Sequence, residues 1–340
     1  MTAPTRRFLA WWLFAVACLV FLLAMVGAAT RLTGSGLSIT EWQPVMGVVP
    51  PLSDADWLSL FAKYQTIPEY QLVNKGMSLD AFQTLFWWEW THRLIARGIG
   101  FVVAVPLIAL VAWRAISAAW LGRLCVLLGL GGLEGLVGWY MVASGLSTRT
   151  DVSQYRLAMH LGVAILIFIT TLWLAFRARF GEGRGLKYSS GLLVLGLIYL
   201  QAISGAFVAG LDAGLSHNTW PLMDGEIFPA GLLVMSPWVA NFFENALTVQ
   251  FDHRMLAYVV AAVVIWHGLT VRRNSADAAV KNSALWLMLG VFGQIALGIV
   301  TLLHAVPITL GIAHQAGAFL VIALATWHAF TLSRQARASA

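Results

Sequence analysis

The chain alternates between long apolar segments and shorter polar ones. Eight of the apolar segments are long enough to cross a hydrocarbon core about 30 Å thick as α-helices. We place these segments at 9–29, 84–112, 121–143, 157–176, 190–210, 247–270, 283–303 and 309–332. The pattern predicts an all-α polytopic membrane protein with eight transmembrane helices.

Composition supports a membrane protein. Apolar residues make up 59% of the 340 positions and charged residues 11%, whereas a soluble domain has about a quarter of its residues charged. The two cysteines, Cys18 and Cys125, lie inside apolar segments, which argues against a disulfide framework or a cysteine zinc site. The basic start of the chain continues into an apolar segment without a clear cleavage site, so we expect a retained first helix.

The basic residues determine the expected orientation. An even number of spans puts both termini on one side, and loops on the cytoplasmic side carry the excess of Lys and Arg. We therefore expect cytoplasmic termini in a cell inner membrane, and the net charge of +6 is no sign of a nucleic-acid partner. The inner segments carry 13 of the 21 Lys and Arg residues, namely Arg6, Arg7, Arg114, Arg123, Arg177, Arg179, Arg184, Lys187, Arg272, Arg273, Lys281, Arg334 and Arg337.

Two of the outer loops, 30–83 and 211–246, are long and rich in Trp, Gly and Pro. Loops of this length are usually functional. Residues 54–63 have the apolar period of a helix, so we expect part of the first loop to lie along the membrane surface as a helix.

The chain contains an internal repeat. A shift of 178 residues aligns one segment with another without a gap, and further on His92-Arg93 matches His253-Arg254, Gly138 matches Gly298 and His160 matches His314. Repeats of four helices keep the same orientation, which predicts tandem four-helix bundles, 1–180 and 181–340, related by a pseudo-two-fold axis along the membrane normal. The ungapped matches pair Gly27, Ala28, Gly36, Leu37, Ser38, Trp42, Gly47 and Pro51 with Gly205, Ala206, Gly214, Leu215, Ser216, Trp220, Gly225 and Pro229.

Each half places two histidines at the outer ends of different helices: His92 and His160 in the first half, His253 and His314 in the second. Ionisable groups inside a bilayer are expensive and tend to mark function. Iron in a planar macrocycle takes axial ligands from opposite faces, which facing helices supply. Zinc would need further ligands that the sequence does not place nearby. The four histidines therefore predict a haem site near the outer surface in each half.

The halves differ beside their histidines. Glu89 precedes His92 by three residues and shares its helix face, whereas the matching residue in the second half is Gln250. A carboxylate beside one macrocycle can accept a proton or stabilise charge, so we expect a reacting haem in the first half and a spectator haem in the second. Glu89 could instead pair with Arg93, four residues on.

The arginines that follow the histidines, Arg93 and Arg254, are candidate partners for haem propionates, because guanidinium binds carboxylate with two hydrogen bonds. The alternative is that these arginines extend to the membrane interface.

Several other polar residues are open to two interpretations. Glu134, matched by Gln294, could relay protons or be hydrogen-bonded in the core, and we favour the core role. His267 and His328 each lie 14 residues after a candidate ligand, about 21 Å along the same helix face. They could hold an additional inner haem, but histidine is readily tolerated near helix ends and the first half has no counterparts, so we favour no haem there. His217 and His304 lie in the outer loops and could line the mouth of a haem site, but we favour solvated loop histidines.

The sequence resembles the haem A synthase family over nearly its whole length. The resemblance rests on Glu89, His92 and Arg93, on Phe251-Asp252-His253-Arg254, on Tyr155-Arg156-Leu-Ala-Met-His160 and on Asn218-Thr-Trp-Pro-Leu-Met223. In the first outer loop, Trp57, Phe61, Tyr64, Pro68-Glu69-Tyr70, Asn74, Met77 and Phe82 look like the mitochondrial and alphaproteobacterial branch. Some bacterial members have cysteine pairs in the outer loops, and this chain has none.

The resemblance implies an oxidoreductase that converts haem O to haem A for terminal oxidase assembly by oxidising the methyl group at porphyrin position 8 to a formyl group. It implies that His253 and His314 hold a haem b cofactor, that His92 and His160 receive haem O, and that Glu89 is the essential acidic residue. The implied partners are haem O delivered from haem O synthase, the lipid bilayer and an electron donor, either ferredoxin-like or a quinol. A homo-oligomer is compatible with the sequence.

Two other functions fit the paired histidines. A di-haem b-type electron carrier would exchange electrons and modify no porphyrin, and a haem transporter or chaperone would use the histidines as transient ligands. The chemical identity of the bound haems distinguishes these functions from the synthase.

Overall fold

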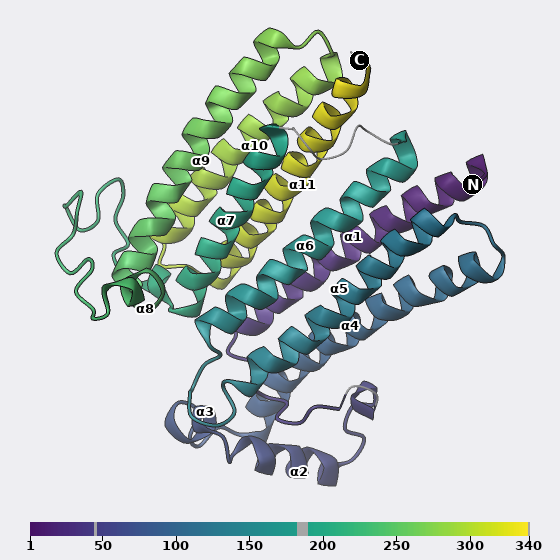
Figure 1. The fold of residues 1–340 in the computed structure, drawn as a ribbon. Helices are drawn as coiled ribbons and strands as arrows, with labels where there is room; N and C mark the ends of the chain where they lie inside the picture. The colour runs from purple at the N-terminus through teal and green to yellow at the C-terminus, as the bar shows by residue number, and fades with distance from the viewer. Residues whose placement is uncertain (44–45, 182–189, 339–340) are drawn as a thin grey trace.

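Eight long helices make up most of the computed structural model, which describes residues 1–43, 46–181 and 190–338 (Figure 1). Each of the eight predicted segments falls inside one of these helices, so the predicted all-α fold is confirmed. They are α1 (Ala3–Leu32), α4 (Leu79–Ala112), α5 (Ala118–Ala143), α6 (Gln154–Phe180), α7 (Ser190–Gly210), α9 (Ala246–Asn274), α10 (Ala278–Leu303) and α11 (Ile308–Ala338). Their length and composition, and the relatives reported below, make the chain a multi-pass membrane protein.

Local sequence signals set several helix ends. The helices α4, α9 and α10 each begin with an N-cap side chain that accepts hydrogen bonds from backbone N–H groups of the first turn, as preferred N-cap residues do. These residues are Ser78, Asn245 and Asp277. Gly181 follows α6 with a φ of +85°, a conformation that glycine adopts without steric penalty. Each cap satisfies polar groups that the helix end would leave unpaired.

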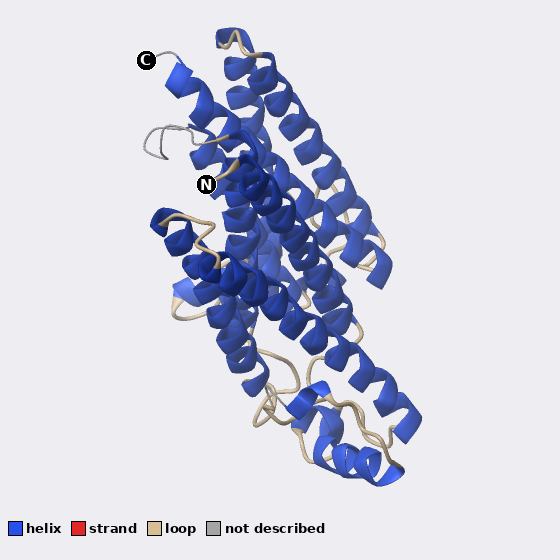
Figure 2. Cartoon of the chain, turned by 90° about the vertical axis from the view of Figure 1, so that its right-hand side faces the viewer, coloured by secondary structure: helices blue, strands red, loops and turns tan. Residues whose placement is uncertain are grey.

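Both chain termini lie at one end of the bundle, and the short helices of the long loops lie at the other (Figures 1 and 2). The helix predicted at 54–63 is present as α2 (Asp54–Tyr64), which begins with a capping box at Ser53. The other short helices in these loops were not predicted. They are η1 (Met46–Val48), α3 (Pro68–Leu72), η3 (Ala213–Leu215), η4 (Trp238–Ala240) and α8 (Asn241–Glu244).

Helix contacts within the two predicted halves correspond. In the first half, α1 and α5 each contact both α4 and α6; in the second, α7 and α10 each contact both α9 and α11. Between the halves, α6 contacts α7 as α11 contacts α1, and α6 contacts α11. This pattern is compatible with the predicted pseudo-two-fold axis, because such an axis pairs every contact with an equivalent one.

A contact at the end of the bundle that carries the long loops joins the halves. The Arg31 guanidinium donates to the carbonyl oxygen of Ala209, its own equivalent under the 178-residue shift, and lies 3.0 Å from Asp212 Oδ1. Residues that touch their own equivalents lie close to a two-fold axis.

Apolar side chains fill the space between the helices and also cover much of the outside. Leu13, Ile165, Phe319 and Ile322 are almost fully buried between helices. Trp11, Trp113, Trp266 and Trp286 are exposed, as expected for side chains that face lipid or its interface. Among the basic residues used to predict the orientation, Arg184 and Lys187 lie outside the described residues.

Candidate functional site

The four candidate histidines occupy corresponding places in the two halves. His92 lies on α4 and His160 on α6, and the two are within electrostatic range of each other. His253 on α9 and His314 on α11 form the same relation in the second half. The structure therefore brings the residues together in the pairs that the sequence predicts.

Each of these imidazoles packs against a glycine on a neighbouring helix. A Cβ atom added at Gly27 of α1 would lie 2.9 Å from Cε1 of His92, and one at Gly205 of α7 would lie 3.2 Å from Cε1 of His253. The other pair of glycines lies on α5 and α10. The corresponding distances are 2.9 Å from Gly138 to His160 and 2.8 Å from Gly298 to His314. Any larger residue would displace the ring, since carbon atoms pack at about 3.5–4.0 Å.

Sequence reasoning used these four glycines only as markers of the repeat. Their role in seating the histidines was missed, although their recurrence in both halves was the available signal. Each candidate histidine thus has a glycine opposite its ring, which we call a notch, and these four glycines join the candidate site.

Unpaired polar atoms gather around the candidate ligands. Among the described residues, buried atoms without a hydrogen-bond partner include Nδ1 of His92 and of His160, Oε2 of Glu134, and Oε1 of Gln201 and of Gln294. Buried polar atoms are nearly always paired, so these unpaired atoms single out the surroundings of the histidines as the candidate site. The notches and these imidazoles fit a planar macrocycle whose metal takes nitrogen ligands.

The side chains beside the rings differ between the halves. Nδ1 of His253 lies 3.1 Å from Nε2 of Gln201 and 3.2 Å from Oγ of Ser204. The 178-residue shift puts Leu23 and Val26 at these two positions in the first half. The first-half His92 therefore has apolar neighbours where His253 has polar ones.

Glu89 is the centre of a buried polar cluster in the first half. Its side chain is 4% exposed, and its Oε2 accepts hydrogen bonds of 2.7 Å from both Ser38 Oγ and the Ile39 backbone N–H. Its Oε1 lies 2.5 Å from Nη2 of Arg93. The ion pair between Glu89 and Arg93, one of the two alternatives from the sequence, is present.

The outer loop carbonyls also hold Arg93. Its guanidinium donates to the carbonyls of Ile39 and Glu41, at 3.0 and 3.1 Å. In the second half, Arg254 donates to the carbonyls of His217 and Thr219, at 2.7 and 2.8 Å. These acceptors are again separated by 178 residues, so both arginines fasten an outer loop to the bundle. Their propionate role stays a prediction.

Gln250 replaces the carboxylate in the second-half cluster. Its Oε1 accepts from Arg254 at 3.2 Å, and its Nε2 donates to the carbonyls of Ala213 and Ser216 at 2.8 and 2.7 Å. The amide therefore keeps the loop attached without introducing a negative charge.

The inner histidines form a pair of their own. Nε2 of His267 lies 2.9 Å from Nε2 of His328, and Nδ1 of His328 lies 2.8 Å from Oγ of Ser283. The two rings are buried and bonded directly to each other. Ligands on opposite sides of a metal would be about 4 Å apart, given metal–nitrogen bonds of about 2.0–2.1 Å. The preference for no additional haem at these two histidines stays a prediction.

The remaining histidines lie at the loop ends. His217 Nδ1 is 2.5 Å from Asp224 Oδ2, and the hydrogen bond from His217 holds the pKa of that carboxyl below its ordinary value. Exposed His304 caps the end of α10, with Nδ1 2.8 Å from the Val300 carbonyl oxygen.

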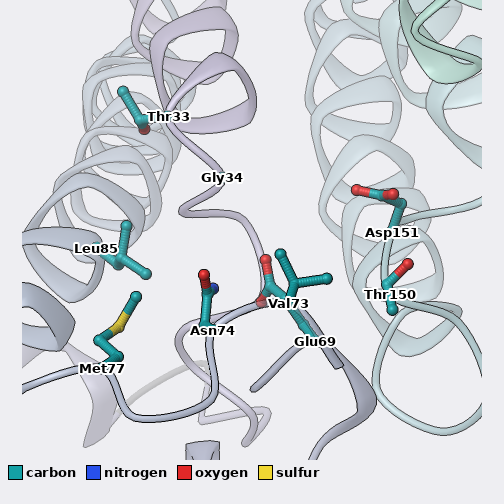
Figure 3. A pocket seen from close by; sticks show the side chains of 9 residues that line it. All are labelled: Thr33, Gly34, Glu69, Val73, Asn74, Met77, Leu85, Thr150 and Asp151. Carbon is teal, nitrogen blue, oxygen red and sulfur yellow. The ribbon is translucent and has the colours of Figure 1, made fainter. Parts of the chain in front are cut away.

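A cavity of about 300 Å³ opens beside the first outer loop. In Figure 3, Glu69, Val73 and Asn74 lie between Leu85 and Met77 on one side and Thr150 and Asp151 on the other. The Tyr64 hydroxyl donates to Glu69 Oε2 at 3.2 Å. Burial raises the pKa of Glu69 to about 7, which makes it a proton-exchanging group at neutral pH. Sequence reasoning noticed Glu69 only through the resemblance and did not predict the cavity.

Comparison with known proteins identifies the family. Residues 10–326 match the family described as cytochrome oxidase assembly protein. The chain belongs to this family. It is 50% identical to the heme A synthase of Parvibaculum lavamentivorans over 98% of this chain and 96% of that protein. It is 48% identical to the heme A synthases of a Chelativorans species and of Brucella anthropi, over 96% and 95% of this chain and 92% and 91% of theirs. These matches confirm the resemblance seen in the sequence.

Proposed function

We propose that this protein is a haem A synthase, a membrane-bound oxidoreductase that converts haem O to haem A for cytochrome oxidase assembly. Relatives that share about half of its residues over nearly the whole chain carry that name. The observation that carries the proposal is the pair of repeat-matched histidine sites, of which one has a buried carboxylate, Glu89, where the other has Gln250.

The two proposed halves, 1–180 and 181–340, have different tasks. His92 and His160 receive haem O, and His253 and His314 hold haem b. When bound, haem b would supply one-electron redox chemistry as a relay, or serve as a structural partner of the substrate haem. Gln201 and Ser204 give His253 polar contacts that His92 does not have, which suits a resident group in the second half and an exchangeable substrate in the first.

Glu89 acts on the substrate. The reaction comprises two hydroxylations of the methyl group, each a two-electron oxidation for which an external oxidant and oxygen source are required, and the resulting geminal diol loses water to give the formyl group. Glu89 holds or moves a proton, or stabilises developing positive charge, from a position fixed by Ser38, Ile39 and Arg93. Since this carboxylate has three hydrogen-bond donors, its orientation is set before substrate binds.

The site lies near the outer side of the cell inner membrane, with both termini in the cytoplasm. Support comes from the bias of basic residues and from the position of the histidines near the end of the bundle that carries α2, α3 and α8. Haem O carries a long apolar tail, so it partitions into lipid and enters between helices from haem O synthase. The electron donor is ferredoxin-like or a quinol.

Extraction of the bound haems tests the function. The purified protein is extracted with acid, and the haems are separated by chromatography. A haem A synthase yields haem b together with haem O, a hydroxylated haem or haem A. Haem b alone in both sites contradicts the synthase and supports a di-haem electron carrier, and haem that leaves unmodified with an acceptor protein supports a transporter.

A further inference from the structure

The helices α5 and α10 each present two residues, one turn apart, to a candidate axial histidine. On α5 these are Glu134 and Gly138, which face His160. On α10 they are Gln294 and Gly298, which face His314. Residues four apart share a helix face, so one face supplies both the notch for the ring and a polar partner for its nitrogen.

The polar partners are at similar distances but differ in chemistry. Oε1 of Glu134 lies 3.1 Å from Nδ1 of His160, and Nε2 of Gln294 lies 3.2 Å from Nδ1 of His314. A carboxylate can only accept a hydrogen bond, so it requires a proton on Nδ1 and leaves the Nε2 lone pair free for a metal. The amide carries no charge, and its Nε2 also donates to the His314 carbonyl at 2.8 Å.

The contact between Glu134 and His160 leaves polar atoms unpaired. Although Nδ1 of His160 lies 3.1 Å from Glu134 Oε1, the two groups are not aligned for a hydrogen bond, and Nδ1 of His160 and Oε2 of Glu134 are both buried without a hydrogen-bond partner. A buried polar group left unpaired in this way is destabilising. A small rotation of either side chain would close the hydrogen bond from Nδ1 to Oε1, the arrangement in which a carboxylate orients a metal-binding histidine.

We infer that Glu134 is a positioning residue that orients the His160 ring and places a carboxylate beside it, so that the oxidised iron is stabilised in the first half relative to the second. The inference rests on the proposed function, in which His160 binds the substrate haem. It assigns to Glu134 a role that the sequence did not predict, since the two alternatives considered there were a proton relay and a core hydrogen bond.

The asymmetry gives the two haems different potentials. An anionic partner stabilises ferric iron and lowers the midpoint potential of the first-half haem, so that haem loses an electron more readily than the second. The neutral Gln294 adds no charge, so the second haem has the higher potential and is the easier of the two to reduce. The chain thus repeats at α5 and α10 the carboxylate-to-amide difference seen between Glu89 and Gln250.

Reciprocal substitution tests the inference on the purified protein with its bound haems. Glu134→Gln gives the first half the residue of the second, and Gln294→Glu does the reverse. The midpoint potentials of both haems are measured by spectroelectrochemical titration and assigned to the halves with His160→Ala and His314→Ala. Gly135→Ala on α5 is the control, because an added Cβ there meets no atom within 4 Å.

We expect Glu134→Gln to raise the midpoint potential of the first-half haem and Gln294→Glu to lower that of the second. Loss of such a partner typically changes metal affinity about 10–100-fold. A tenfold change in the relative affinity for ferric and ferrous iron equals about 59 mV for a one-electron couple. Each shift is confined to its own half, and the control leaves both potentials unchanged.

Unchanged potentials in Glu134→Gln, with haem content equal to that of the wild type, overturn the inference and return Glu134 to a purely structural role. So does an equal shift of both haems. The titration reads the iron and not the product, so it gives a result even if extraction finds haem b alone. Failure of this inference is therefore distinguishable from failure of the proposed function.

Discussion

Replacing Glu89 with glutamine changes the charge of the first-half cluster with little change of shape. The second half shows that a glutamine fits such a position, since Gln250 bonds to Arg254 and to two loop carbonyls. The first-half partners are different, because Ser38, Ile39 and Arg93 all act as donors toward Glu89.

The magnitude follows from these contacts. Whichever end the new NH2 group takes, it faces a donor, either the Ile39 N–H or the Arg93 guanidinium. One buried donor left unpaired costs about 1–3 kcal/mol. Glu89→Ala removes the carboxylate that pairs with the largely buried Arg93, and loss of one partner of a buried ion pair typically lowers the free energy of unfolding by about 3–5 kcal/mol. We take about 3 kcal/mol, since Arg93 keeps two loop carbonyls.

The expected effect on reaction is larger than the effect on folding. Loss of a positioned proton-transfer group lowers the rate by about 10²- to 10⁴-fold, so we expect Glu89→Gln to bind haem and to form almost no haem A. The assay measures haem A formed per bound haem, by chromatography of extracted haems, together with the thermal unfolding midpoint in detergent.

His328→Ala is the matched control for destabilisation. This residue is fully buried and is 14 positions beyond His314 on the same helix, about 21 Å away. It should lower the unfolding midpoint and preserve haem A formed per bound haem. Wild-type haem A formation by Glu89→Gln would refute the catalytic role of this carboxylate, and equal loss of activity in the control would show that the assay reports stability alone.

Three further predictions concern other parts of the molecule. The 2.9 Å contact between His267 and His328 predicts that a double-mutant cycle of His267→Ala and His328→Ala gives a coupling free energy of about 0.6–1.7 kcal/mol. The free energy of unfolding of each variant measures this coupling. A value of zero would contradict a hydrogen bond between the two rings. Gly138→Val should displace the His160 ring, which an added Cβ approaches within 2.9 Å, and should lower the haem content of the first half. The control Gly135→Val should leave the haem content unchanged. Haem absorbance per protein measures both variants, and equal haem content would contradict the role of Gly138 in placing the ring. Burial raises the pKa of Glu69 from 4.5 to about 7, so between these pH values the folded protein holds a proton that the unfolded chain has lost. The contribution of Glu69 to the free energy of unfolding is therefore fully present below about pH 4.5. It is lost as the pH rises through 7, by about 3 kcal/mol in all. Glu69→Gln should flatten this dependence of the unfolding midpoint, and an unchanged slope would contradict the shift.

The eight spans could be predicted because hydrophobic length alone separates them from their loops. The histidine pairs could be predicted because the repeat puts the same residue types at the same depth twice. The contact between Gly27 and His92 could not, because it depends on how α1 and α4 are rotated about their axes. The same limit applies to Arg93, whose acceptors at Ile39 and Glu41 are about fifty residues away in the chain.

The short helices and the cavity were beyond the sequence for another reason. The helix α8 has four residues, too few for a helical period to be recognised. The cavity beside Glu69 is formed by segments from α1 to the α5–α6 connection, and no local pattern reports such an assembly. Glu69 was visible only through its resemblance to a family motif.

The central claim is that the two histidine pairs hold different haems and that the first pair holds the substrate. The most direct measurement is chromatography of the haems extracted from purified His92→Ala and His253→Ala. The account predicts that His92→Ala loses haem O and its oxidised products but keeps haem b, and that His253→Ala loses haem b. Loss of the same haem from both variants, or haem b alone from each, would contradict it.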